Sequence, residues 1–226
     1  MENKGARYIE MDHSILDLHA FREQKQMQGE EKAADLLEKA QAFTERYANI
    51  RESVRAKSLF RKLLSLPEDS RLTPIQERIY SEWFLHDYKT IQGLTMFNLF
   101  LRNHAKELSE PDLIQGALFL TSTFEPVKVK KVIQNKFELS ILDLYSNEEY
   151  ILVQRNMELS EVKENGTYFI RKIPLMIRSF GIGGVYPFHD IDILNEMQKE
   201  FLLQKQGIEN YTWRAFLKKN AVKYIF

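Results

Sequence analysis

The apolar positions between residues 30 and 54 repeat with the period of an α-helix. They follow one another at intervals of four and three residues, which places them along one face of a continuous helix. The stripe consists of Leu36, Ala40, Phe43, Tyr47, Ile50 and Val54. Because it is shorter than three heptads, it predicts a helix packed in a bundle and not an extended coiled coil. Residues 1–29 are mostly polar, and we expect either an N-terminal arm or a docked helix there.

Further helices are predicted by the residues that precede them. Thr73 can cap a helix whose first residue is a proline, and a glutamine three residues later can complete a capping box. Gly93 can end that helix, and Thr95 can cap the next one. Ser109 stands before another proline in the same arrangement. We therefore expect at least four helices before residue 122.

After residue 123 the period of the apolar pattern changes to two, which is typical of β-strands. The predicted strands cover residues 127–133, 137–141, 149–153, 167–172, 175–180 and 185–188. We interpret the glycine-rich segment 181–184 as a turn between the last two strands, because glycine adopts positive φ at no steric cost. Short strands with close turns predict a small antiparallel sheet or barrel.

The helical period returns over residues 191–206 and again over 211–219. In the first of these helices the side chains expected to face inward are Ile193, Leu194, Met197, Phe201 and Leu202. The fold class is therefore α+β, with an N-terminal helical bundle, a small antiparallel β-sheet or barrel, and C-terminal helices. The expected units are an arm or docked helix over 1–29, a helical module over 30–123, a small β module over 124–189, and helices over 190–226 that pack on the preceding modules.

Composition changes this picture mainly by exclusion. Of the 226 residues 44% are hydrophobic and 12% aromatic, which is enough for a real core and excludes global disorder. The chain has no cysteine, which excludes disulfides, thiolate zinc sites, iron–sulfur clusters and a cysteine nucleophile. Basic and acidic residues balance at 32 each, without the basic excess of a dedicated nucleic-acid binder. Since neither a signal-peptide core nor a membrane-length apolar run is evident, we expect a cytoplasmic protein that makes no membrane contact.

Two adjacent His-Asp pairs are candidates for metal chemistry. His86-Asp87 is the pair that an HD-type phosphohydrolase needs, but the nearest preceding histidine, His19, lies in a weak segment. We interpret Asp87 as an anchor for the break near Gly93 and His86 as part of a mixed helix face. The second pair, His189 and its neighbouring aspartate, is explained better by a helix cap.

Other catalytic motifs are incomplete. The 181–184 segment lacks the Gly-Lys-Ser/Thr ending of a P-loop and the spacing of a Rossmann fingerprint. The Gly-x-Ser-x-Gly motif of serine hydrolases does not occur. Paired carboxylates for glycoside chemistry stay open, because Glu and Asp are spread along the whole chain. We assign no catalytic residue, no metal ligand and no cofactor.

Two basic clusters are candidates for binding nucleic acid or an acidic protein partner. The first, here called the basic stripe, consists of Arg51, Arg55, Lys57, Arg61 and Lys62. The second consists of Lys128 and Lys130, followed by Lys131, at a predicted strand edge. The alternative interpretation is that both are solvated faces, or that the strand lysines discourage edge-to-edge pairing.

The aromatic block over residues 77–88, with the glycine and threonine after it, resembles a set of uncharacterised bacterial proteins that often carry a SEC-C motif elsewhere. The matching residues are Trp83, Phe84, Asp87, Gly93, Thr95, Phe100 and Leu101, followed by Asp143-Leu144, the strand 150–153, and a Gly166-to-Arg171 strand ending at Pro174. The similarity covers residues 74–188, about half of the chain, and implies a fold and not a reaction. The SEC-C zinc motif needs cysteines, so its zinc binding and docking role are not implied here.

These observations predict a cytosolic interaction protein without catalysis, in which the helical module is a rigid scaffold and the β module presents a binding surface to a protein partner. The first alternative is a nucleic-acid- or ribosome-associated factor that uses the basic stripe. The second is a metal-dependent phosphohydrolase built on His86 and Asp87. The oligomeric state stays open.

Overall fold

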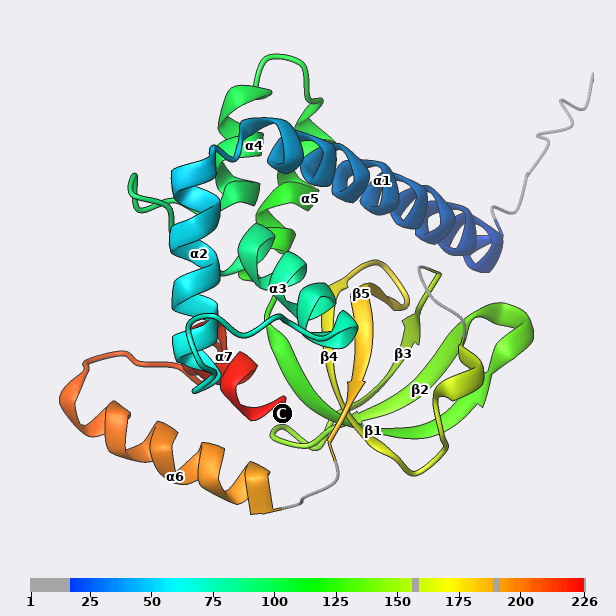
Figure 1. Ribbon diagram of the computed structural model, residues 1–226. Helices are drawn as coiled ribbons and strands as arrows, with labels where there is room; N and C mark the ends of the chain where they lie inside the picture. The colour runs from blue at the N-terminus through cyan, green and yellow to red at the C-terminus, as the bar shows by residue number, and fades with distance from the viewer. Residues whose placement is uncertain (1–16, 156–158, 189–191, 226) are drawn as a thin grey trace, which may run out of the picture.

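Five helices precede a five-stranded sheet and two follow it in the computed structural model, which describes residues 17–155, 159–188 and 192–225 (Figure 1). The helices are α1 (Leu18–Tyr47), α2 (Ile50–Leu63), α3 (Pro74–His86), α4 (Met96–Asn103), α5 (Glu110–Thr121), α6 (Asp192–Gly207) and α7 (Trp213–Asn220). The α+β class predicted from the sequence is confirmed. Since α1 already begins at Leu18, the predicted boundary between residues 29 and 30 falls inside a helix.

The sheet closes on itself. Its strands are β1 (Phe124–Ile133), β2 (Glu138–Asp143), β3 (Glu149–Val153), β4 (Thr167–Pro174) and β5 (Ser179–Pro187). They form a closed barrel in the order β1-β2-β3-β5-β4, with β4 paired to β1. Neighbouring strands are antiparallel except β3 and β5, which run parallel and pair only through Leu152–Ser179 and Val153–Phe180. The sheet is therefore mixed.

The predicted helix caps are formed. The Thr73 hydroxyl accepts the amide proton of Gln76 while the Gln76 side chain accepts that of Thr73, a complete capping box. Thr95 caps α4 by accepting from the Asn98 amide at 3.2 Å, and Ser109 caps α5 in the same way. These local bonds satisfy backbone donors that a helix leaves open at its start.

The stripe predicted to run through residue 54 does not form one helix. Helix α1 ends at Tyr47, and the Asn49 side chain caps α2 by accepting the Glu52 amide proton at 2.9 Å. The change of direction turns the last two stripe positions outward, so that Ile50 is 83% and Val54 63% exposed. The spacing predicted a continuous face, but the local cap ends it.

The segment predicted as a turn at 181–184 lies inside strand β5. Ile170 pairs with Val185 and Arg171 with Ile182, so Gly183 and Gly184 are extra residues that form a β-bulge. Gly183 has a φ of +72°, which a glycine adopts without strain. The turn prediction is therefore wrong, although the positive φ that motivated it is present.

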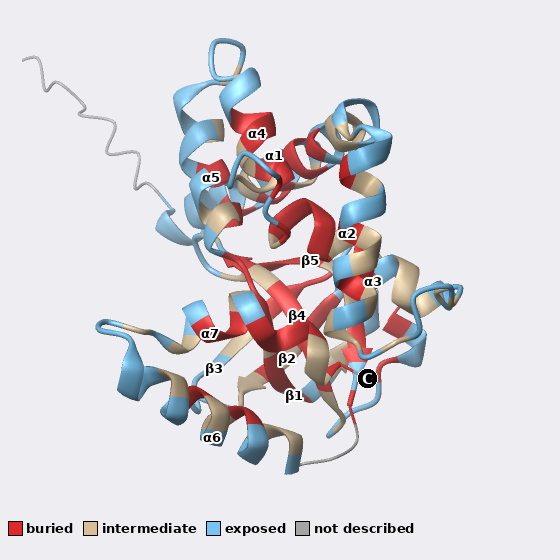
Figure 2. Cartoon of the chain, turned by 60° about the vertical axis from the view of Figure 1, so that its left-hand side comes forward, coloured by how far each residue is buried: buried red, intermediate tan, exposed pale blue. Residues whose placement is uncertain are grey.

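Buried residues gather where the helices meet the barrel (Figure 2), and their side chains form two clusters. The smaller cluster fills the barrel with residues such as Val129, Ile141 and Leu152. The larger one joins the helices to the outer side of the barrel, where Phe169 and Phe180 are fully buried. The helices therefore pack on the outside of the barrel through a core that is separate from the one inside the barrel.

Helix α6 contributes little to that core. It buries Met197 and Phe201, while Ile193 and Leu194 are half-buried. Leu202, predicted to face inward, is 58% exposed. That prediction is wrong because α6 packs along only one narrow face.

Helix α1 holds the barrel with its N-terminal half. The side-chain oxygen of Gln26 accepts the amide protons of Ile177 and Arg178 at 2.8 and 3.2 Å. The Arg178 guanidinium lies 2.6 Å from Glu23 and 3.0 Å from Glu138. Since Gln26 is fully buried, these bonds fix the loop between β4 and β5 against α1.

Among the helices in the described ranges, none has an apolar stretch long enough to cross a bilayer.

Candidate functional site

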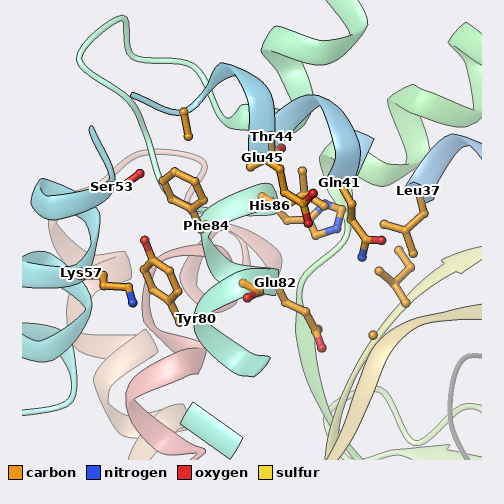
Figure 3. Close-up of a pocket in the computed structure, with 15 residues that line it drawn as sticks. Leu37, Gln41, Thr44, Glu45, Ser53, Lys57, Tyr80, Glu82, Phe84 and His86 are labelled. Atoms are coloured by element: carbon orange, nitrogen blue, oxygen red, sulfur yellow. The ribbon is translucent and has the colours of Figure 1, made fainter. Parts of the chain in front are cut away.

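A groove runs along α3, between α1 and strand β5 (Figure 3). It consists of two adjoining cavities of about 530 and 650 Å³. Both are lined by Leu37 and Gln41 of α1, Ser81 and Glu82 of α3, and Gly183 of β5. We call this feature the α3 groove. The volume of each cavity is in the range of small-molecule sites.

Two ionisable side chains of α3 meet the groove from the same side of the helix. Glu82 and His86 are four residues apart, and that spacing places side chains next to each other on a helix. Both line the smaller of the two cavities, which we call the inner cavity, and Glu82 extends towards β5 (Figure 3). The capping box at the start of α3 and the burial of Trp83 away from the groove fix this orientation.

The carboxylate of Glu82 is only half engaged. One oxygen accepts the Gly184 amide proton at 2.7 Å and the hydroxyl proton of Tyr186. The other oxygen, Oε2, is buried and has no hydrogen-bond partner among the described residues. Burial raises the pKa of Glu82 to about 7, against the opposing effect of Tyr186, Arg171 and the Gly184 amide. The group therefore changes charge near neutral pH.

The bulge in β5 is shaped around Glu82. A Cβ atom built on Gly183 would lie 2.0 Å from the Glu82 carboxyl group, so no larger residue fits without movement of that side chain. On the barrel side, the Gln154 amide donates to the Gly183 carbonyl at 2.5 Å. Bulges often redirect groups next to functional sites, and this one directs the Gly184 amide at a carboxylate.

His86 is buried with both ring nitrogens unpartnered among the described residues. Its ring stacks on Phe97, with centroids 5.3 Å apart, and on Phe119, at 6.1 Å. Burial, together with the charges of Arg171 and Lys218, holds its pKa well below the usual value, so the ring is neutral. A neutral imidazole offers one donor and one acceptor, and neither has a partner in the part of the chain that the structure describes.

Asp87, the neighbour of His86, belongs to a different site. Its two oxygens face the Arg171 guanidinium, and Lys218 lies 3.3 Å from Oδ1. Arg171 is fully buried, donates to the Ser122 carbonyl at 2.8 Å, and lies 4.3 Å from the centre of the Phe124 ring. This buried cluster joins α3, β4, α7 and the end of α5.

The suggested metal pair is therefore divided between a groove and an ion pair. No group of three His, Asp or Glu side chains suitable for a metal occurs in the part of the chain that the structure describes. Asp87 was interpreted as an anchor for the break near Gly93, whereas its carboxylate binds Arg171, 84 residues away. The second pair, His189 and Asp190, lies outside the described residues.

Most of the basic stripe is bound to neighbouring groups. Arg55 donates to the Tyr88 hydroxyl at 2.6 Å and to Glu52 at 3.2 Å. Arg61 donates to the Ser70 carbonyl at 3.0 Å. Lys57 and Lys62 lie 3.2 and 3.7 Å from Glu77 and Glu68 respectively. Arg51 is exposed. The structure thus does not bring these residues together into one open cationic surface.

The strand lysines lie on β1, beside a second bulge. Val127 and Val129 are buried in the barrel, so Lys128 between them is only half-buried on the outside. The pairing with β2 shifts between Val129 and Lys131, and Lys130 is the extra residue. Lys130, Lys131 and the nearby Lys136 are exposed.

The residues of the aromatic resemblance have structural positions. Trp83 and Phe84 are buried, and the Trp83 ring packs 5.4 Å from Phe60. Gly93 has a φ of +76° in the turn after α3, and Thr95 caps α4. These residues pack, turn or cap the helices of the helical module, and of the four only Phe84 lines the groove.

Sequence patterns missed Glu82, Arg171 and Tyr186. One signal was available for the arginine, since it interrupts an apolar strand segment, Tyr-Phe-Ile-Arg-Lys-Ile. The signal for Glu82 was its spacing from His86 within the aromatic block.

Comparisons with protein-family models, with curated proteins and with solved structures each found no match to this chain.

Proposed function

We propose that this chain is a cytosolic binding protein that takes a small ligand in the α3 groove, without catalysing a reaction. The observation that supports it is the pair of unused polar groups in one cavity: Oε2 of Glu82 and the ring nitrogens of His86. A buried polar atom without a partner costs about 1–3 kcal/mol, so a ligand that bonds to these atoms recovers that cost.

The sequence-based hypothesis placed binding on the β module. The groove uses that module through strand β5 and Glu161, while the α-helical part of the chain supplies the rest of its lining. The proposed ligand site therefore lies between the two modules, where small-molecule sites often occur.

The test is a fragment screen by protein NMR on the full chain. We expect binders to shift the amide signals of Gly183 and Gly184, because Glu82 bonds to the second of these. Gln41→Trp should abolish the shifts, since Gln41 lines both cavities and is exposed. Glu31→Trp, on an exposed position of the same helix, is the matched control. A screen that shifts no signal of the groove would refute the proposal.

A second candidate function is nucleic-acid binding. We place its site on the hairpin between β1 and β2 in place of the basic stripe. Three exposed lysines there, Lys130, Lys131 and Lys136, have no acceptor among the described residues. Next to them Phe137, 49% exposed, has a φ of +54° that is uncommon for a bulky side chain. Exposed aromatics between cations can stack on unpaired bases. In one class of five-stranded barrels the loop between the first two strands contacts oligonucleotides, although a fold analogy alone assigns no function.

Single-stranded oligonucleotide binding at two salt concentrations tests this second candidate. We expect affinity that falls with added salt, since bound phosphates release counterions. Replacing the three hairpin lysines with glutamate should remove the binding, whereas Arg51→Glu with Lys62→Glu should not. The reverse result would return the function to the basic stripe.

A further inference from the structure

We propose that the ligand of the α3 groove is a small organic cation with N–H donors, an amine or a guanidinium. This inference rests on the proposed function of the groove and adds the chemical class of its ligand. It is carried by the charges that line the two cavities, by the unpartnered groups at their junction, and by the aromatic wall of the inner cavity.

The lining of the groove is acidic although the whole chain is neutral. Four carboxylates line the two cavities, against two cationic side chains. The carboxylates are those of Glu38, Glu45, Glu82 and Glu161, and the cations are Lys57 and Arg78. Lys57 is partly neutralised by Glu77 at 3.2 Å. A concave surface with an excess of one charge concentrates ligands of the opposite charge.

The buried atoms at the junction of the cavities select for donors. Oε2 of an ionised Glu82 can only accept hydrogen bonds, and it has no hydrogen-bond partner among the described residues. His86, 1% exposed and neutral, adds one acceptor nitrogen and one N–H donor from the next turn of α3. An ammonium or guanidinium group carries several donors, which match Oε2 of Glu82 and the acceptor nitrogen of His86. A carboxylate or phosphate ligand would instead place its oxygens against Glu82.

The inner cavity also has an aromatic wall that already accepts a cation. Tyr80 and Phe84 stack at 5.6 Å and both line the cavity. The ammonium of Lys57 lies 5.4 Å from the centre of the Tyr80 ring. The faces of aromatic rings attract cations electrostatically. A ligand ammonium is therefore favoured by the ring faces as well as by the carboxylates.

The test compares three probes with the same carbon skeleton and different charge: diaminobutane, butanediol and succinate. Binding is measured on the full chain by calorimetry and by the Gly184 amide signal. We expect diaminobutane to bind, butanediol to bind at least about tenfold more weakly, and succinate not to bind, because a charge-assisted hydrogen bond strengthens binding by that order. Equal or tighter binding of butanediol or succinate would overturn the cation inference and leave the groove as a ligand site.

Two variants distinguish binding of the cation at Glu82 from its general attraction to a negatively charged protein. Glu82→Gln keeps an oxygen for Gly184 and should weaken diaminobutane about tenfold, whereas Glu110→Gln, an equal loss of charge on α5 outside the groove, should change it little. An equal effect of the two variants would overturn the inference. Binding should also weaken as pH falls below about 7, because Glu82 then takes up a proton. The other ionisable groups that face Glu82 or line the groove are Glu38, Glu45, Lys57, Arg78, Tyr80, His86, Asp87, Glu161, Arg171 and Tyr186.

If no probe of any charge and no fragment shifts the groove signals, both the proposed function and this inference fail. If neutral or anionic fragments bind while diaminobutane does not, only the cation inference fails.

Discussion

Helix α3 is joined to the barrel by two carboxylates that lie five residues apart and behave differently. Asp87 meets the buried Arg171, and both of its oxygens are bound. Glu82 meets only neutral groups, the Gly184 amide and the Tyr186 hydroxyl, and one of its oxygens stays without a partner among the described residues. Both are held by strands of the same barrel, β4 and β5.

The difference separates a carboxylate whose two oxygens are both bound within the fold from one that has an oxygen without a partner among the described residues. A buried carboxylate whose two oxygens both contact a guanidinium is held by charge-assisted hydrogen bonds and acts structurally. A buried carboxylate without a cation in direct contact has a raised pKa, and its charge then responds to pH and to whatever enters the cavity. Perturbed groups of the second kind concentrate at functional sites.

Removing the cation of the first carboxylate should have the largest effect. Arg171→Leu leaves Asp87 buried beside Lys218 alone, and we expect a loss of about 3–5 kcal/mol in the free energy of unfolding. Urea denaturation measures it. The double variant Asp87→Leu with Arg171→Met should recover much of that loss, because no buried aspartate is left without its partner. A single variant as stable as wild type would show that the cluster contributes nothing.

The apolar packing of α3 gives a stability change with which the effects of the two carboxylates can be compared. Trp83 is 9% exposed and packs against Phe60 and Tyr88. Trp83→Ala should destabilise the protein by about 3–4 kcal/mol, through lost burial and the cavity left behind. The same denaturation experiment measures it. A near-neutral result would mean that this side of α3 does not stabilise the fold.

The second carboxylate should make stability depend on pH. The pKa of Glu82 is about 7 in the folded protein and 4.5 ordinarily, so the folded state holds the proton more tightly than the unfolded state. Stability therefore falls as pH rises from about 4.5 to 7, by on the order of 2–3 kcal/mol in this window. Comparison of wild type with Glu82→Gln at each pH isolates this contribution. Parallel stability curves for the two proteins would contradict it.

Perturbing the bulge should have a smaller effect. Gly183→Ala forces a side chain into a positive-φ position and towards the Glu82 carboxyl group, at a cost of about 1–2 kcal/mol. Thermal denaturation measures it. Gly93→Ala is the matched control, since Gly93 also has a positive φ, +76°, and nothing lies within 4 Å of its added Cβ. Similar melting temperatures for the two variants would show that the bulge is not constrained by Glu82.

Local signals explain which parts of the fold could be predicted. The side chains of Thr73, Thr95 and Ser109 each cap a helix by accepting a backbone amide proton three residues further along the chain. Such local bonds can be predicted directly from the sequence. The alternation of Val127 and Val129 with lysines likewise shows which face of β1 enters the barrel. The α+β order follows from such signals.

The site could not be predicted because its partners are distant in sequence. Glu82 bonds to Gly184 across 102 residues, and Arg171 bonds to Asp87 across 84. No periodicity reports which strand a helix will face. The parallel pairing of β3 and β5 and the inclusion of 181–184 in one strand depend on closure of the barrel in the same way.

The bonds of Gln26 to the loop at Ile177 and Arg178 also affect how the chain folds during synthesis. The two partners are separated by 152 residues, so α1 leaves the ribosome long before its binding loop exists. At about 5–20 residues per second this delay is roughly 8–30 s. During that time the N-terminal half of α1 has no barrel to pack on, and its docking is a late step of folding. Slowing translation over the β4–β5 region should therefore lengthen the period in which α1 is open to proteases.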